Sequence, residues 1–229
     1  MSFSILLFSC VEDVNISFEE VYISSENRIE INIPKAKGNK TIVEVINTDI
    51  ETAVARELYI GSADSESPKT INESINLFNE EFHVFKTDFP ESEQIWEAQI
   101  DGEVLFQSPE IISVSITSYV NTGGAHGILN ITFLNFESTT GKQIPNKNLF
   151  TDSDSLKEIV KKHVIEATRK KDIVFEPENF QLPQNIGYTE DGVIFLYNTF
   201  QIGPYSSGII EFTIPFEEIK SYLVFNSTN

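Results

Sequence analysis

The chain has 229 residues, of which 40% are hydrophobic and 22% are charged, so it can bury a core in one large domain or two small ones. Sixteen Lys and Arg residues against 35 Asp and Glu residues give a formal net charge of −19. A field of that sign repels nucleic acids and anionic lipid headgroups, and it attracts cationic proteins, although the same acidity also favours simple solubility.

The N-terminus surrounds the single cysteine of the chain, Cys10, so an intrachain disulfide is excluded. The run MSFSILLFSC (1–10) is apolar and ends in Ser9-Cys10, and it resembles the lipobox of bacterial lipoproteins, in which the cysteine is lipidated. An apolar run of this length is too short for a transmembrane helix, which needs about 20 residues. We therefore expect residues 1–17 to be a signal remnant and tether with a lipid anchor at Cys10; the alternative is a buried N-terminal strand with a free thiol.

Residues 18–110 are expected to form an N-terminal α/β subdomain. One or two strands are predicted within 18–36, where Ile29, Ile31 and Ile33 alternate with polar residues. A helix is predicted over 39–60, because apolar residues recur there every four positions. These are Ile42, Ile46, Ile50, Val54 and Leu58.

A second helix is predicted over 67–89, with Ser67 as N-cap and Pro68 at the first helical position. Its apolar stripe is expected to be core and consists of Ile71, Ile75, Phe78, Phe82, Phe85 and Phe89. Strands over 94–100 and 103–108 are predicted to form a hairpin that turns at Asp101-Gly102.

Residues 111–229 are expected to form a C-terminal α+β domain. Strands are predicted over 110–121 and 128–137, a helix over 152–171 capped by Asp152 or Ser153, and a hairpin over 185–200. A last strand from 208 leads into a short helix after Pro215. The fold class is α+β: two N-terminal helices with short strands, then an antiparallel sheet packed with one long helix and a short C-terminal helix.

The loop Thr122-Gly123-Gly124-Ala125-His126-Gly127 joins two predicted strands and has two interpretations. Thr122 could be a nucleophile with His126 as its base, and glycine N–H groups could hold an oxyanion. The glycines could instead close the hairpin tightly, with His126 packing or hydrogen-bonding locally and Tyr205 as a candidate neighbour. No metal site or cofactor is expected, because His83, His126 and His163 do not form a His-Glu-x-x-His pattern.

The second half of the chain contains several short motifs that we consider as one set. They are Tyr119, Thr122 to Gly127, Thr140-Gly141-Lys142, Leu149-Phe150, Phe195, Tyr197, Ile202-Gly203-Pro204-Tyr205, Gly208 and Ile214-Pro215. This set resembles an extracytoplasmic domain found in RsiV-type, lysozyme-sensing anti-sigma factors and in PdaC-type peptidoglycan deacetylases. Residues 18–110 fit the smaller α/β region that precedes the domain in that family.

The resemblance implies a non-enzymatic lipoprotein, lipid-anchored and extracytoplasmic in a bacterial cell envelope, whose ligand is a cationic protein such as lysozyme or a cell-wall glycan such as peptidoglycan. The anti-sigma and deacetylase roles are not expected, because no sigma-binding segment precedes Cys10 and no deacetylase domain follows residue 223. The alternative is an envelope hydrolase, an esterase or a peptidoglycan-modifying accessory protein that uses Thr122 and His126. The candidate ligand-binding residues are Thr122, Gly123, Gly124, Ala125, His126, Gly127 and Tyr205.

Overall fold

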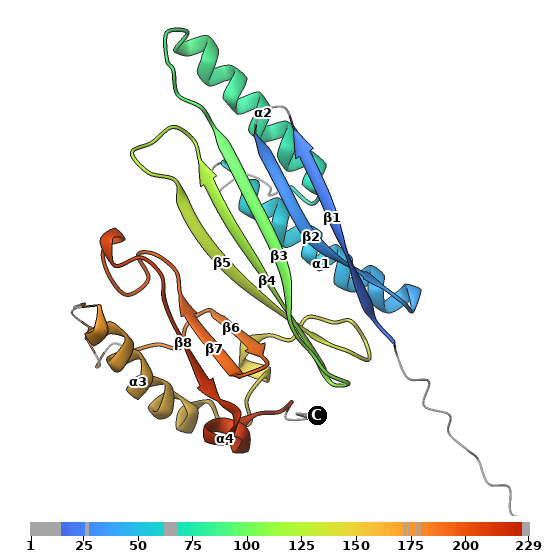
Figure 1. Ribbon diagram of the computed structural model, residues 1–229, viewed down its shortest axis with the longest axis vertical. Helices are drawn as coiled ribbons and strands as arrows, with labels where there is room; N and C mark the ends of the chain where they lie inside the picture. Colours follow the sequence, from blue (N-terminus) through green and yellow to red (C-terminus); the bar gives the residue numbers. More distant parts are fainter. Residues whose placement is uncertain are drawn as a thin grey trace, which may run out of the picture.

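The computed structural model describes residues 15–25, 28–61, 68–171, 173, 175–176, 178 and 180–225. Cys10 and the predicted tether up to residue 14 lie outside these residues. The described strands form a five-stranded sheet in the order β1-β2-β3-β4-β5 and a three-stranded sheet in the order β6-β7-β8 (Figure 1). Their bounds are β1 (Ser17–Ser25), β2 (Ile29–Lys37), β3 (Glu97–Gln107), β4 (Ile111–Asn121), β5 (Ile128–Glu137), β6 (Asn185–Thr189), β7 (Gly192–Tyr197) and β8 (Ile210–Pro215).

Two helices connect β2 to β3, namely α1 (Lys40–Leu58) and α2 (Ile71–Asp88). This long crossover allows β2 and β3 to run parallel, whereas the other neighbours in both sheets pair antiparallel. The α+β class is confirmed, as are the two predicted helices and the strands predicted within 18–36. The expected division near residue 110 falls in the turn between β3 and β4, which are paired strands of one sheet.

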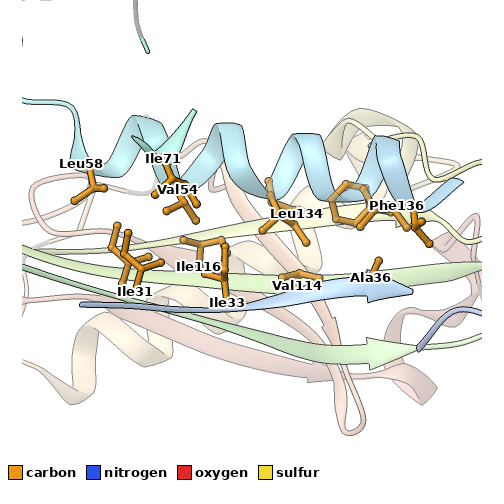
Figure 2. Packing of buried hydrophobic residues seen from close by; sticks show 14 of the residues in the cluster. Ile31, Ile33, Ala36, Val54, Leu58, Ile71, Val114, Ile116, Leu134 and Phe136 are labelled. Atoms are coloured by element: carbon orange, nitrogen blue, oxygen red, sulfur yellow. The ribbon is translucent and has the colours of Figure 1, made fainter. Parts of the chain in front are cut away.

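The first core lies between α1 and one face of the five-stranded sheet (Figure 2). The five predicted apolar positions of α1, from Ile42 to Leu58, are all buried. Alternate residues of β4, Ile112, Val114 and Ile116, face them and are buried as well. Apolar residues at every fourth position of α1 therefore pack on apolar residues at every second position of β4, as packing of a helix on a sheet requires.

The start of α2 differs from the prediction. The helix begins at Ile71 with Thr70 as N-cap, and Pro68 precedes it; Ser67 is outside the described residues. Thr70 and Glu73 form a reciprocal capping box, in which each side chain accepts a hydrogen bond from the other's backbone N–H. The predicted aromatic stripe packs on Trp96, with the exception of Phe89, which is 59% exposed at the end of the helix.

The hairpin predicted at Asp101-Gly102 is wrong, because β3 continues through both residues as one strand. A Cβ atom at Gly102 would lie 2.6 Å from Cδ of Pro34 on β2. The glycine therefore permits close packing between neighbouring strands rather than a turn. The chain reverses further on, between Gln107 and Ile111.

The three-stranded sheet lies against the other face of the larger sheet and is covered by α3 (Ser153–Lys170) (Figure 1). Asp152 is the N-cap of α3, one of the two predicted caps, and Leu156, Val160 and Val164 are buried. The strand β8 leads into the short helix α4 (Phe216–Ile219), which also confirms the prediction. Among the described residues, no helix is both long and apolar enough to cross a membrane.

A buried polar network joins the two sheets. Ser113 on β4 donates a hydrogen bond from Oγ to Oδ1 of Asn135 on β5 (2.9 Å), and its Oγ accepts one from the backbone N–H of Tyr188 on β6 (3.0 Å). Asn135 donates from Nδ2 to the carbonyl of Ile186 (2.8 Å). Because these side chains and backbone groups are hydrogen-bonded to one another, the cost of their desolvation is offset, and the network fixes β6 across the larger sheet.

Candidate functional site

The glycine loop between β4 and β5 needs glycine at two of its three positions. Gly123 has φ = 82°, a left-handed conformation that disfavours residues with a side chain. A Cβ atom at Gly127 would lie 2.4 Å from the ring of Tyr119. Gly124 has no such restraint, since its Cβ would meet its nearest neighbour at 3.9 Å. Two of the glycines thus close the hairpin, as the structural interpretation expects.

The catalytic pairing of Thr122 with His126 is not formed. Both residues are exposed, and among the described residues no hydrogen bond joins them. The imidazole of His126 instead stacks on the ring of Tyr205, with centroids 5.1 Å apart and planes at 15°. Tyr205 also donates a hydrogen bond from its hydroxyl to the carbonyl of Gly127 (3.2 Å). The predicted neighbourhood of His126 and Tyr205 is confirmed.

Phe200 extends this stack and was not a predicted site residue. Its ring lies 5.6 Å from that of Tyr205, and its side chain is 68% exposed. The backbone of Phe200 has φ = 72°, which is rare for a bulky residue and costs of the order of 1–3 kcal/mol. We call the set of His126, Phe200 and Tyr205 the aromatic tip. Ile128, 61% exposed, follows the glycine loop directly at the start of β5.

The other two histidines lie outside the tip. His83 is exposed on α2, as expected of a helix-surface residue. His163 on α3 lies 2.9 Å from a carboxylate oxygen of Glu218 and stacks on Phe212 of β8. The described residues contain no group of three or more His, Cys, Asp or Glu side chains that could hold a metal ion.

A second feature is a cavity of about 540 Å³ between α1, β5 and the start of β6, which we call the amide cavity. It is also lined by the segment 143–146 and by two residues that follow β7. Its lining is rich in carboxamide side chains and also includes Phe133 and Leu134. The carboxamides are Asn130, Gln143, Asn146, Gln184, Asn185, Asn198 and Gln201.

Glu57 on α1 forms one wall of the amide cavity and is anchored to the sheet. Its carboxylate accepts hydrogen bonds from Ser118 Oγ (2.6 Å), from Asn130 Nδ2 (3.0 Å to each oxygen) and from Thr132 Oγ1 (3.1 Å). These bonds to a charged acceptor are of the stronger kind, and they hold Glu57 and Asn130 in fixed positions.

A second carboxylate, Asp49, lines the cavity further along α1. Burial raises the pKa of Asp49, and the positive charge of Arg56 opposes this shift. Asp49 and Glu57 are eight residues apart, which is about 12 Å along a helix axis. This axial separation is longer than the spacing of up to about 9.5 Å between the two carboxylates of glycoside hydrolases, so the pair gives no support for glycoside hydrolysis.

Comparison with known families connects these features. The family described as "Deacetylase PdaC" matches residues 22–129, and the family described as "Protein of unknown function (DUF3298)" matches residues 147–217. These matches support a PdaC/DUF3298-like family. The aromatic tip joins both regions, since His126 lies in the PdaC match and Phe200 and Tyr205 lie in the DUF3298 match.

Two solved structures share the fold. A DUF3298 family member from Bacteroides fragilis NCTC 9343 has a TM-score of 0.65 and 19% sequence identity, covering 93% of this chain and 96% of its own. A DUF3298 family protein from Pseudomonas aeruginosa PAO1 has a TM-score of 0.58 and 17% identity, covering 93% and 97%. No curated protein matches the chain. The PdaC-type and DUF3298-type regions thus form one architecture that recurs across nearly the whole length of these structures.

Proposed function

We propose that the chain is a non-enzymatic, lipid-anchored protein of a bacterial cell envelope, and that it binds a cationic protein at the aromatic tip. Lysozyme is the first candidate, because the sequence resembles the domain of lysozyme-sensing proteins. The observation that carries the proposal is the exposed stack of His126, Tyr205 and Phe200, with Phe200 at positive φ.

The stack has the properties of a protein-binding hot spot. Aromatic side chains dominate hot spots because they bury large areas, and rings held in place lose little conformational entropy on binding. Tyr205 is held by the His126 ring on one side and by the hydrogen bond to the Gly127 carbonyl. Phe200 remains 68% exposed despite its strained backbone, which suits a residue retained for contact with a partner.

The charge of the chain supports a cationic partner. A net charge of −19 raises the rate at which a positively charged protein reaches the surface, whatever the position of the contact. The apolar tip would then provide the short-range contact, while the field provides the long-range attraction.

The test is binding of hen egg-white lysozyme to the full chain, measured by surface plasmon resonance. Phe200→Ala should weaken binding at least about tenfold, because it removes an exposed aromatic anchor. Phe89→Ala is the matched control, since Phe89 is 59% exposed at the C-cap of α2 and is not part of the aromatic tip, and this variant should bind like the wild type. Equal affinity of the wild type and both variants, or no binding at all, would reject the tip as a lysozyme site.

A second variant separates contact from folding. Phe200→Gly also removes the ring, but it relieves the strain at φ = 72° and should raise the free energy of unfolding by about 1 kcal/mol relative to Phe200→Ala. A variant that is more stable and still fails to bind identifies the ring, not the fold, as the binding element. Urea denaturation followed by circular dichroism measures this difference.

A further inference from the structure

The outer edge of β8 carries an inference that does not depend on the proposed function. β8 is an edge strand of the three-stranded sheet; it pairs with β7, and α3 packs beside it (Figure 1). Among the residues that the structure describes, no backbone hydrogen bond other than those to β7 reaches the strand Ile210–Pro215. Such an edge offers a row of unpaired N–H and C=O groups to another extended chain.

A groove of about 300 Å³ lies between β8 and α3, and we call it the β8 groove. It is lined by four consecutive residues of β8, Ile210 to Thr213, and by one side of α3. The α3 residues are His163, Glu166, Ala167, Lys170 and Lys171. The helix rises about 12 Å from the first to the last of these positions, and four residues of an extended chain span about 13 Å. The groove therefore has the length of a strand of four residues.

We propose that the β8 groove binds the C-terminal end of a partner polypeptide as an added strand, antiparallel to β8, with its terminal carboxylate beside Lys170 and Lys171. Strand addition would pair the free backbone groups of the edge. An antiparallel peptide places its last residue opposite Ile210, the first residue of β8. Lys171 lies at this end, because its Nζ donates to the carbonyls of Ser207 (3.4 Å) and Ile209 (2.6 Å), which precede β8.

The charges at this end of the groove are complementary to a carboxylate. Arg169, Lys170 and Lys171 are three consecutive cations at the C-terminal end of α3. Nζ of Lys170 lies 2.9 Å from a carboxylate oxygen of Glu166, but the Lys170 side chain is 69% exposed, and an ammonium group has three donors. Lys170 can therefore donate to a second carboxylate without losing the first.

The alternation of side chains along β8 determines which peptide residues suit the groove. The ring of Phe212 stacks on His163 of α3, so Phe212 and Ile210 point toward the helix. Glu211, between them, points to the opposite face of the sheet and away from the bound carboxylate. Directly opposed residues of paired strands share a face. The last residue of the peptide and the residue two positions before it should therefore be apolar, and the other two should be polar.

The first experiment is fluorescence anisotropy of the full chain with fluorescein-Gly-Gly-Thr-Val-Thr-Val, which has a free C-terminal carboxylate. Saturable binding is expected, and the same peptide as a C-terminal amide should bind at least about tenfold more weakly, because charged hydrogen bonds are lost. The net charge of −19 would by itself favour the less negative amide, so a preference for the carboxylate has to come from the local cations. Equal affinity, tighter binding of the amide or no saturable binding would overturn the proposal.

A pair of lysine variants tests the position of the carboxylate. Lys170→Gln should weaken binding of the free-acid peptide at least about fivefold and leave binding of the amide unchanged. Lys162→Gln is the matched control, since it removes the same charge from an exposed position of α3 that does not line the groove. Equal affinities of the two variants would show that Lys170 does not hold the carboxylate.

Two N-methylated peptides test strand addition itself. Successive N–H groups of an added strand point alternately toward β8 and away from it. Methylation of a valine N–H and of the neighbouring threonine N–H should therefore have unequal effects, with a large loss of affinity for one peptide and a small loss for the other. Equal affinity of these two peptides would overturn strand addition.

A second copy of the chain is the competing occupant of the edge, although two chains of charge −19 repel each other. Sedimentation velocity of the full chain without peptide should show that the β8 edge is free. A dimer that dissociates when the free-acid peptide is added would assign the groove to self-association and overturn the proposal of a partner polypeptide.

Discussion

Two buried tyrosines of the three-stranded sheet differ by one hydrogen bond. Tyr197 on β7 donates from its hydroxyl to the carbonyl of Gln181 (2.8 Å). The hydroxyl of Tyr188 on β6 is buried, and it has no hydrogen-bond partner among the described residues. The two side chains are 4% and 1% exposed, so they offer a matched comparison of a paired and an unpaired buried hydroxyl.

Replacing each tyrosine by phenylalanine should therefore have different effects. Tyr197→Phe should lower the free energy of unfolding by about 1 kcal/mol, because it leaves the Gln181 carbonyl without its donor. Tyr188→Phe should leave this free energy unchanged or raise it, because it removes a hydroxyl that was desolvated without compensation. Urea denaturation of both variants at pH 7 measures the difference, and equal destabilisation would contradict this account.

The same pair should set part of the alkaline stability. Burial raises the pKa of both phenols, and the nearby carboxylate of Glu110 raises that of Tyr188 further. The unfolded chain loses these protons near pH 10, whereas the folded chain retains them. The stabilisation is therefore complete below about pH 10 and declines as the pH rises above it. The range from pH 9 to pH 11 brackets the unperturbed tyrosine pKa of about 10. Over this range, the free energy of unfolding should fall less in each phenylalanine variant than in the wild type.

At the scale of elements, β3 shows how packing overrides a local turn signal. Asp-Gly is a strong hairpin dipeptide, yet Gly102 lies in mid-strand, because β2 passes close to it. Gly102→Ala would bring a methyl group to 2.6 Å from Pro34 and 3.1 Å from Ile116. We expect this variant to lower the free energy of unfolding by about 1–3 kcal/mol.

Gly124→Ala is the control for this prediction. Gly124 is exposed, and its added methyl group would meet its nearest neighbour at 3.9 Å. Its effect should stay within about 0.5 kcal/mol. Guanidinium denaturation compares the two variants. A neutral Gly102→Ala would mean that the sheet accommodates a methyl group there, and the turn signal would then need another explanation.

The elements that could be predicted from the sequence are those with long periodic patterns. The helices α1 and α3 and the strands β4 and β5 carry a clear spacing of apolar residues, and their existence and approximate bounds are confirmed. The proximity of His126 and Tyr205 was also predicted, from motif resemblance. The amide cavity could not be, because its side chains come from segments between residues 49 and 201 that meet through tertiary packing alone. Phe200 carries no sequence signal, since positive φ is not expected of phenylalanine.

At the scale of the whole molecule, both candidate sites depend on how the two sheets meet. The aromatic tip joins the β4–β5 loop to the segment between β7 and β8, and the amide cavity lies between α1 and the start of β6. The hydrogen bonds that Ser113 accepts from β6, that Asn135 donates to β6 and that Asn198 donates to β5 hold the sheets together. The PdaC-type and DUF3298-type regions therefore have to pack together before either site is complete.

The net charge of −19 predicts how a cationic ligand should respond to salt. Raising the ionic strength from about 0.01 M to about 0.15 M shortens the Debye length from about 30 Å to about 8 Å, so long-range attraction is screened while contact at the apolar tip is not. The association rate constant for lysozyme should therefore fall at least about tenfold, and the dissociation rate constant should change little. Phe200→Ala should instead raise the dissociation rate constant and leave the association rate constant nearly unchanged, because it removes a contact that forms after encounter. Surface plasmon resonance resolves both constants. An association rate that does not depend on salt would show that the acidity serves solubility and does not steer a cationic ligand.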